Sequence, residues 1–356
     1  MSGLEPTDGP LTFDELRLAT RNRGVPLEAL RYEVTPGGLH YLLTHFDVPD
    51  VDAAAWRLEV GGAVSRPLTL TLDELRARSS RTHVVTMECA GNGRALLTPR
   101  PVSQPWLDEA VSTAEWTGVP LRDVLADAGV LPRAVELAFR GADHGTQGGV
   151  EQDYARSLPV AEAVRPEVLL AYEMNGRPLE PQHGAPLRLV VPGWYGMTSV
   201  KWLASIKAIT RAFDGYQQAV AYRYQRDADD AGEPVSRMRV RALMIPPGFP
   251  DFMTRRRVAE AGLVTLRGRA WSGVADIARV EVGVDGEWRD AVLERRVGDW
   301  AWRGWSFCWQ APSGEHVLAC RATDAAGRTQ PSAPEWNYQG MGNNLVQSVP
   351  VTARRR

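Results

Sequence analysis

Residues 83–94 have the sequence HVVTMECAGNGR, and this stretch indicates most clearly how the chain folds. Its first six residues form an apolar, β-rich run, which predicts a strand that ends just before Cys89. Gly91 and Gly93 predict a tight, exposed loop after the strand, because glycine adopts the positive φ values of a sharp exit. Arg94 places a cation near the sulfur and favours a thiolate, which suits a soft metal centre. The alternative is a buried free cysteine that acts as a small apolar residue.

Two further blocks lie downstream of this stretch. Residues 171–188 (AYEMNGRPLEPQHGAPLR) lead into VPGWYG at 191–196 and VKWL at 200–203, and residues 301–303 are AWR. Together with residues 87–94, the blocks resemble the sulfite oxidase family, and the similarity runs from about residue 38 to the end of the chain. Three separated blocks in the family's order are more specific than any one short motif.

The resemblance implies an α+β, sulfite-oxidase-like molybdopterin-binding domain, followed by an immunoglobulin-like β-sandwich that mediates dimerisation. Short β-rich runs and helical stretches such as 121–128 alternate irregularly, which favours α+β over a doubly wound fold. Strand signals at short intervals in the last third indicate a sandwich. We expect an N-terminal arm at residues 1–37, with Thr12 capping a helix, a catalytic domain at 38–234 and a dimerisation domain at 235–356.

Composition agrees with a soluble enzyme. The chain has 356 residues, 44% of them hydrophobic, a net charge of −2 and a pI near 6.3, which argue against nucleic acid or an anionic membrane as partner. The N-terminus lacks a signal peptide pattern and no segment is apolar enough to span a membrane, so we expect a cytoplasmic protein. In that compartment Cys308 and Cys320 should be reduced.

The resemblance also assigns cofactor ligands. Cys89 would bind molybdenum, and the molybdopterin would contact side chains that offer cations, hydroxyls or an acid: His45, Asp143, His183, Arg188, Ser199 and Lys201. A pterin cofactor ends in a phosphate, which cations and backbone N–H groups bind well. Taken singly, each cation could be a solvated surface charge, His45 a satisfied core histidine and Asp143 a turn former.

Residues that match the family's substrate pocket are Arg94, Trp106, Arg303 and Tyr224, with Tyr222 as the alternative active-site tyrosine. One departure concerns the anion site, because Leu43 stands where the family has an arginine. Losing one charge-assisted contact would weaken sulfite binding roughly ten- to a hundred-fold.

The implied activity is two-electron oxygen-atom transfer, with oxidation of sulfite to sulfate as the first choice. No haem attachment motif is present, so electrons would pass to oxygen or to a separate carrier. The missing arginine keeps open a sulfoxide or N-oxide reductase, or an oxidase of another sulfur compound. A cofactor carrier or storage protein, working as a homodimer, is the alternative without catalysis.

Overall fold

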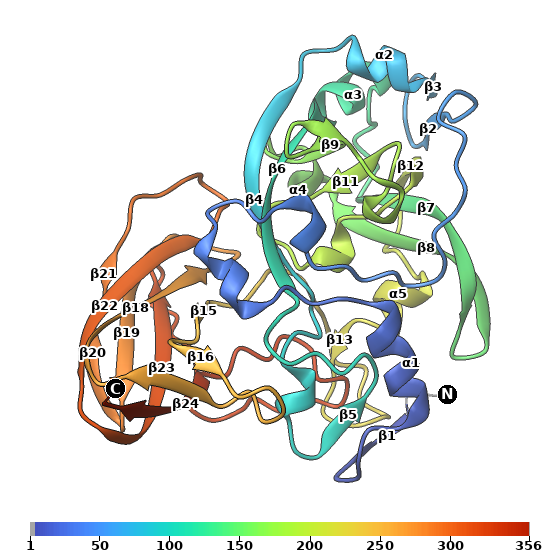
Figure 1. Ribbon diagram of the computed structural model, residues 1–356. Coiled ribbons are helices and arrows are strands. Elements are labelled where there is room, and N and C mark those ends of the chain that lie inside the picture. Colours follow the sequence, from blue (N-terminus) through green and yellow to red (C-terminus); the bar gives the residue numbers. More distant parts are fainter. Residues whose placement is uncertain (1–3, 356) are drawn as a thin grey trace.

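The computed structural model describes residues 4–355, which form two β-rich lobes lying side by side (Figure 1). The larger lobe ends with strand β12 (Leu203–Ile209), and the smaller lobe begins with β15 (Arg241–Met244). Between them the chain makes a short hairpin, β13 (Arg223–Tyr224) and β14 (Glu233–Pro234). No helix in the described part of the chain is both long and apolar enough to cross a membrane.

Within residues 4–355, two five-stranded sheets form the larger lobe, with strand orders β10-β9-β6-β4, where β11 also pairs with β9, and β3-β2-β12-β7-β8. The strands are β2 (Leu58–Gly62), β3 (Leu68–Leu70), β4 (Arg81–Glu88), β6 (Val111–Pro120), β7 (Glu136–Gln147), β8 (Val150–Pro159), β9 (Leu169–Met174), β10 (Arg177–Pro178) and β11 (Arg188–Val190). Side chains from both sheets meet in one apolar core that contains Leu58, Phe139, Leu170 and Leu189. This core fixes the position of β4, which leads to the site.

The helices of the larger lobe are short, namely α2 (Leu72–Arg76), α3 (Leu121–Ala128), α4 (Val160–Ala163) and α5 (Tyr216–Ala219). Helix α2 begins at a capping box, in which the Thr71 hydroxyl accepts the Glu74 N–H and the Glu74 carboxylate accepts the Thr71 N–H. Helix α3 ends at Gly129, whose φ of 66° suits glycine. Leu75 and Leu125 carry the apolar faces of α2 and α3 into the core. The α+β prediction is confirmed.

The described part of the smaller lobe holds a four-stranded sheet, β15-β18-β22-β21, and a six-stranded sheet, β16-β17-β24-β23-β19-β20. Their bounds are β16 (Phe249–Pro250), β17 (Arg257–Glu260), β18 (Gly262–Trp271), β19 (Ile277–Val284), β20 (Glu287–Asp290), β21 (Val292–Leu293), β22 (Arg303–Ala311), β23 (Gly314–Asp324) and β24 (Gln347–Arg354). Leu266 and Trp305 of the first sheet pack with Val280, Leu318 and Val351 of the second. The predicted immunoglobulin-like sandwich is confirmed.

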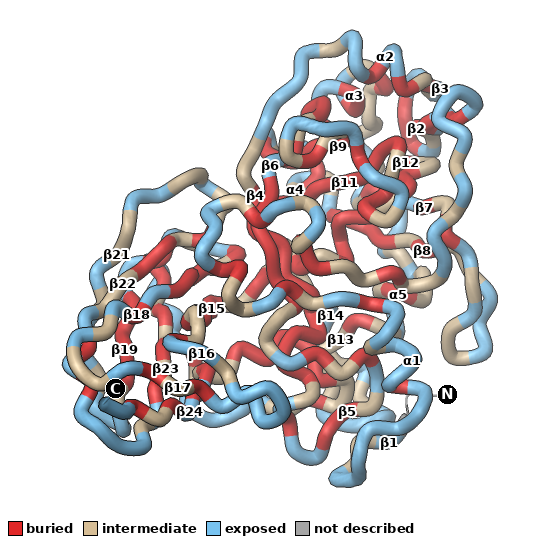
Figure 2. Tube along the Cα trace, viewed as in Figure 1, coloured by how far each residue is buried: buried red, intermediate tan, exposed pale blue. Residues whose placement is uncertain are grey.

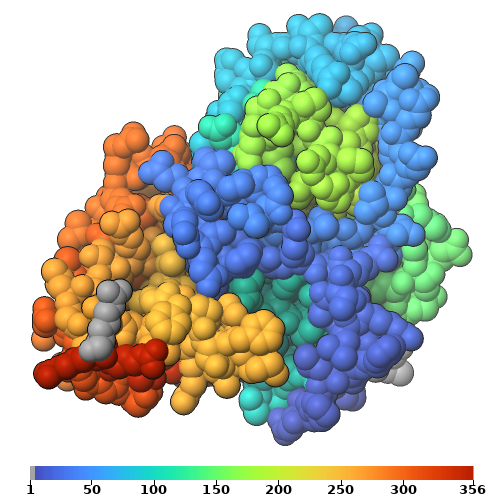
Figure 3. All heavy atoms as spheres, in the orientation of Figure 1, coloured from blue at the N-terminus to red at the C-terminus, as the bar shows by residue number. Residues whose placement is uncertain are grey.

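The described N-terminal residues lie across the front of both lobes (Figure 3). They form β1 (Leu4–Thr7), paired with β5 (Arg100–Val102), and α1 (Phe13–Arg21), which begins at the predicted cap Thr12. Further along, the Leu30 carbonyl accepts from Arg269 Nε at 2.8 Å, and the Glu33 carbonyl accepts from Trp302 Nε1 at 2.8 Å. Both donors belong to the smaller lobe, so the N-terminal segment helps to join the lobes.

Candidate cofactor and active site

Strand β4 ends at Glu88 and delivers Cys89 to a loop that is buried where the two lobes meet (Figure 2). Gly93 has the predicted positive φ, 84°, and opens a 3₁₀ turn at Arg94–Leu96. Gly91 is required for another reason: a Cβ atom there would lie 2.7 Å from the Arg94 guanidinium. The predicted strand and loop are present, but the expectation that the loop is exposed is wrong because the smaller lobe covers it.

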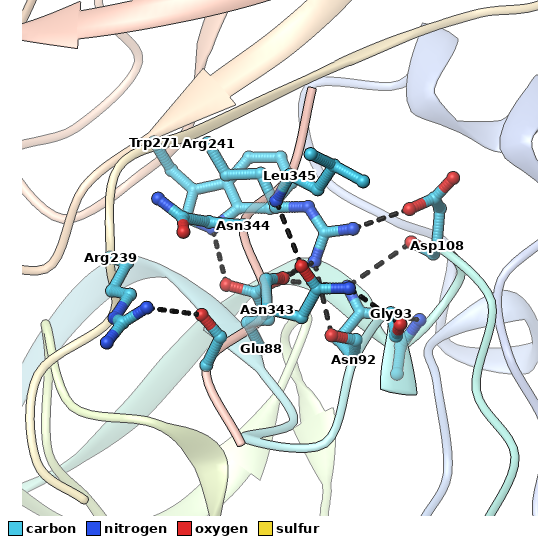
Figure 4. Close-up of polar contacts among 12 residues, drawn as sticks. Glu88, Asn92, Gly93, Asp108, Arg239, Arg241, Trp271, Asn343, Asn344 and Leu345 are labelled. Carbon is cyan, nitrogen blue, oxygen red and sulfur yellow. Dashed lines mark hydrogen bonds and ion pairs between the residues drawn. The ribbon is translucent and has the colours of Figure 1, made fainter. Parts of the chain in front are cut away.

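A buried polar network behind this loop connects the two lobes (Figure 4). Glu88 is 2% exposed and accepts from Arg241 Nη1 at 2.9 Å, Trp271 Nε1 at 2.9 Å and Asn92 Nδ2 at 3.0 Å. Arg241, on β15, also pairs with Asp108. The smaller lobe therefore holds the Cys89 loop through a fully buried ion pair as well as through apolar packing.

A second contact from the smaller lobe reaches the loop itself. Asn343 Nδ2 donates to the Gly93 carbonyl at 2.7 Å, and a Cβ atom on Gly93 would lie 2.9 Å from that amide nitrogen. The close approach requires glycine at this position as much as the positive φ does.

A cavity lies in front of Cys89, and the structure brings all six predicted cofactor contacts to its walls, namely His45, Asp143, His183, Arg188, Ser199 and Lys201. They come from distant parts of the sequence: the segment before β2, strand β7, the 3₁₀ turn Pro181–His183, strand β11 and the residues before β12. Leu43 also lines the cavity and adds no charge to it. The wall thus combines a thiol with acid, imidazole and cationic groups.

The two cations of this wall donate to backbone carbonyl oxygens and not to a carboxylate, although the charge of Asp143 acts on Lys201. Arg188 donates to the carbonyl oxygens of His183 at 3.0 Å and Ser199 at 3.1 Å, and Lys201 Nζ donates to those of Leu43 and Gln182 at 3.0 Å. Neither forms an ion pair within residues 4–355. Burial lowers the pKa of Arg188 to about 10 and that of Lys201 to about 7. Two desolvated cations without a counter-ion favour an anionic ligand.

Three residues of the wall also carry buried side-chain atoms without a hydrogen-bond partner among the described residues: His40 Nε2, Asp143 Oδ1 and Arg188 Nε. Burial raises the pKa of Asp143 to about 6. Unpaired buried donors and acceptors are costly unless a ligand satisfies them. The Asp143 acceptor together with the cations of the wall fits a ligand with N–H groups at one end and a phosphate at the other, as a phosphorylated pterin has.

His45 and Asp143 have structural neighbours of their own. His45 Nε2 lies 2.7 Å from Gln147 Oε1, its ring packs between Phe46 and Tyr154, and burial lowers its pKa. A Cβ atom on Gly141 would lie 2.5 Å from Asp143 Oδ1, so the carboxylate is held close to the backbone. Both side chains still face the cavity.

The Cys89 thiol is 7% exposed, and its burial raises its pKa above the usual value. The neighbouring Arg94 charge, the Gly91 backbone and the Trp106 indole act in the opposite direction but do not outweigh burial. Arg94 thus favours the thiolate, as expected, but burial outweighs its charge. A bound metal cation would supply the missing stabilisation, because coordination deprotonates a thiol.

Arg94 and Trp106 lie beside the sulfur rather than in the cavity wall. The Arg94 guanidinium donates to the Gln339 carbonyl at 2.8 Å, the Gln104 carbonyl at 3.2 Å and Met341 Sδ at 3.4 Å. Trp106 is 5% exposed and packs in the same apolar cluster as Cys89. Arg94 thus contributes its charge to the site, while its donors are engaged elsewhere.

The two candidate tyrosines occupy different places. Tyr222 lines the cavity and lies with its ring 5.4 Å from the buried Arg156 guanidinium. Tyr224 starts the turn toward the smaller lobe, where Arg239 covers its ring at 4.8 Å. The geometry therefore favours Tyr222 and not Tyr224, our first choice from sequence, as the tyrosine of this site.

The structure does not bring Arg303 to the cavity. Its Nε donates to the Glu294 carbonyl at 2.9 Å and its Nη1 to the Ile277 carbonyl at 3.0 Å, both within the smaller lobe. Trp302, the residue before β22, bonds outside its own lobe: its backbone N–H donates to Thr86 Oγ1 at 2.7 Å and its indole Nε1 to the Glu33 carbonyl at 2.8 Å. Arg303 lines a separate cavity with Gly193 and Trp300, so its predicted place in the wall of the Cys89 cavity is corrected.

Comparison with known proteins agrees with this geometry. The oxidoreductase molybdopterin binding domain model matches residues 45–217, and the Mo-co oxidoreductase dimerisation domain model matches residues 233–354. Mitochondrial sulfite oxidase from Mus musculus is 34% identical over 375 residues, covering 97% of this chain and 67% of the mouse protein. Sulfite oxidase from Gallus gallus is 36% identical, covering 86% and 71%. The chain belongs to the sulfite oxidase family.

Two further relatives place the family in context. Nitrate reductase [NADH] 1 from Oryza sativa subsp. japonica is 33% identical, and the match covers 93% of this chain and 40% of the rice protein. The sulfane dehydrogenase SoxCD from Paracoccus pantotrophus shares the fold, with a TM-score of 0.80, 24% identity, and coverage of 100% and 95%. The chain is a molybdopterin-dependent oxidoreductase of this sulfite oxidase and nitrate reductase type, and the carrier or storage alternative is set aside.

Three residues of the site and its supporting network were not predicted from the sequence: His40, Glu88 and Arg241. Glu88 stands beside Cys89, and a carboxylate at the apolar end of a strand is unusual enough to have indicated a buried partner. Its partner Arg241 lies 153 residues away, and no local pattern marks it. His40 follows two glycines and a leucine, and nothing in that context indicates a site.

Proposed function

We propose that the protein oxidises sulfite to sulfate by two-electron oxygen-atom transfer at a molybdenum ion held by molybdopterin and Cys89. The observation that carries this proposal is the juxtaposition of the buried Cys89 thiol with a cavity whose cations, Arg188 and Lys201, lack counter-ions. The cofactor would supply the exchange of an oxygen atom and two electrons. The chain's own residues bind and orient it and exclude water.

The two ends of the cofactor would meet different residues. His183, Arg188, Ser199 and Lys201 would hold the phosphate, because Arg188 and Lys201 are the buried cations of the cavity wall. Asp143 Oδ1, which has no partner among the described residues, would accept an N–H of the pterin ring. Cys89 would then face the metal at the other end of the cavity.

On the substrate side, Tyr222 would donate its hydroxyl proton to an oxygen of the bound anion. Burial raises the pKa of Tyr222 to about 12, which keeps the phenol protonated at neutral pH and able to donate. Arg94 and Arg156 lie near it and supply positive potential. An oxyanion would thus be held by one hydroxyl and by nearby charge, without a guanidinium at position 43.

That shortage of cations favours a second candidate on the same cofactor: a sulfoxide or N-oxide reductase, or an oxidase of another sulfur compound. Leu43 adds no charge and Arg303 does not line the cavity, so a neutral substrate would lose less binding energy here than a dianion. Relatives named for sulfite, sulfane and nitrate chemistry show that substrate choice varies among proteins of this fold.

Metal analysis followed by a steady-state assay tests the proposal. The purified protein should contain one molybdenum per chain and should reduce ferricyanide when sulfite is added. A molybdenum-loaded protein that reduces a neutral sulfoxide but leaves sulfite unchanged would replace the first candidate with the second.

The electron acceptor in the cell is proposed to be oxygen or a separate carrier. Dimerisation is proposed to use the C-terminal sandwich, which matches the dimerisation domain.

A further inference from the structure

His40 is a buried histidine in the cavity wall that the proposed contacts leave without a role. It is 2% exposed, and its ring stacks on that of Tyr41, with 5.3 Å between centroids and 20° between planes. It also meets the Trp116 ring edge-on, at 6.0 Å and 90°. These two aromatic contacts fix the orientation of the imidazole.

The hydrogen bonding of His40 defines its tautomer. Nδ1 lies 2.9 Å from the Tyr41 carbonyl oxygen, and because a carbonyl only accepts, Nδ1 carries the proton. Burial lowers the pKa of His40 to about 4, so the ring is neutral at neutral pH and Nε2 presents a bare lone pair. Nε2 is buried and has no partner within residues 4–355. Such an acceptor needs a donor.

His183, whose ring meets that of His40 and which also lines the cavity, is a neighbour that can supply that donor. The two rings meet edge-to-face, with 5.5 Å between centroids and 81° between planes. Two imidazoles joined by an N–H···N bond of about 2.9 Å have centres roughly 5 Å apart, so a small rotation of His183 completes the bond. A phosphate oxygen could not satisfy Nε2 directly, because both atoms are acceptors.

A neutral His183 has a single N–H, so it cannot donate both to a phosphate and to Nε2 of His40. Burial, with further contributions from His40, Arg188, Lys201 and Arg23, lowers the pKa of His183 to about 3. Among these neighbours Arg188, Lys201 and Arg23 are cationic, so a phosphate dianion beside them would offset much of their charge and favour the imidazolium. Imidazolium has two N–H groups, one for an anion and one for a neighbouring acceptor.

We infer that His40 is a positioning residue for His183: with the cofactor phosphate bound, His183 is an imidazolium that donates one N–H to the phosphate and the other to Nε2 of His40. The proton comes from solvent or from the phosphate monoanion. This inference rests on the proposed function, which assigns the phosphate to His183, Arg188 and Lys201. His40 would thereby set both the orientation and the charge of a phosphate contact that it does not touch.

The test uses full-length, cofactor-free protein labelled with ¹⁵N-histidine and titrated with inorganic phosphate at constant ionic strength. The His183 signals are assigned by their loss in His183→Gln. Two variants place a side-chain amide at different distances from the backbone. In His40→Gln the amide lies near the position of Nε2, and in His40→Asn it lies only near that of Nδ1. In the wild type and in His40→Gln, bound phosphate should give His183 two protonated nitrogens, with affinities within about three-fold of each other.

In His40→Asn the imidazolium signature should be lost and phosphate should bind on the order of ten-fold more weakly. If His40→Asn matches the wild type in both affinity and His183 spectrum, the inference is overturned while the phosphate site stands. If phosphate leaves the wild-type His183 signals unchanged, the phosphate assignment fails together with the inference. Should His40→Asn not fold, the wild-type spectrum still decides, because a singly protonated His183 with phosphate bound contradicts the inference.

Discussion

Replacing Arg241 by methionine should release the Cys89 loop from the smaller lobe. Arg241 and Glu88 are 1% and 2% exposed, and their ion pair is supported by the bonds of Glu88 to Asn92 and Trp271. Removing one partner of such a pair leaves an unpaired buried charge, so Arg241→Met should lower the free energy of unfolding by about 3–5 kcal/mol.

Urea unfolding followed by tryptophan fluorescence measures this loss, and Arg239→Met is the matched control. Arg239 lies two residues before Arg241 and near the same network (Figure 4), but its partner Glu335 is 62% exposed, so its loss should cost under about 1 kcal/mol. Adding Glu88→Gln to Arg241→Met removes the stranded charge and should recover part of the loss, which a double-mutant cycle would report as coupling.

A second readout follows the loop itself. Cys89 is buried and Cys308 exposed, so in a Cys308→Ser background the reaction of cofactor-free protein with a thiol reagent reports access to Cys89. Arg241→Met should speed that reaction, whereas Arg239→Met should not. If the two arginine variants lose the same small stability and Cys89 reacts equally in both, the network does not hold the loop and the reasoning is refuted.

Three other outcomes follow from the site. Arg188→Ala should lower the molybdopterin content of the purified protein more than the rate per bound molybdenum; equal content would contradict its phosphate role. Leu43→Arg should lower KM for sulfite roughly ten-fold. Arg303→Ala should leave KM within about two-fold, because the Arg303 guanidinium bonds to carbonyl groups of the smaller lobe; the reverse pattern in steady-state assays would restore Arg303 to the pocket. Lys201 has its pKa lowered to about 7 by burial, so the unfolded chain binds an extra proton between that pH and its ordinary value. The stability of cofactor-free protein should therefore rise with pH across this window, and Lys201→Met should abolish the rise; a wild-type stability that falls there would disagree.

What the sequence predicts well is local. The helix at 121–128 has the expected bounds and Thr12 caps the expected helix, because their signals lie within a few neighbouring residues. The sandwich follows from strands at short intervals. The resemblance to the sulfite oxidase family identifies the cofactor contacts, and the fold brings these residues to one cavity.

What the sequence does not predict depends on partners far along the chain. The loop after Cys89 contains small and polar residues, which suggest exposure, but Arg241 and Asn343 arrive from the other lobe and bury it. Trp302 bonds to Thr86 and Glu33, whereas the next residue, Arg303, bonds to carbonyl groups of the smaller lobe, and no local pattern distinguishes the two positions. The raised pKa of Cys89 likewise results from burial that no short motif encodes.

The central claim is that the thiolate of Cys89 binds molybdenum, and X-ray absorption at the molybdenum edge measures this directly. Cys89→Ser replaces a soft sulfur donor by a hard hydroxyl, while the phosphate contacts at the other end of the cavity remain. We predict that the Cys89→Ser protein keeps its molybdopterin, shows one sulfur neighbour fewer around molybdenum than the wild type, and loses turnover. An unchanged sulfur count, with activity retained in a folded and metal-loaded Cys89→Ser protein, would contradict it.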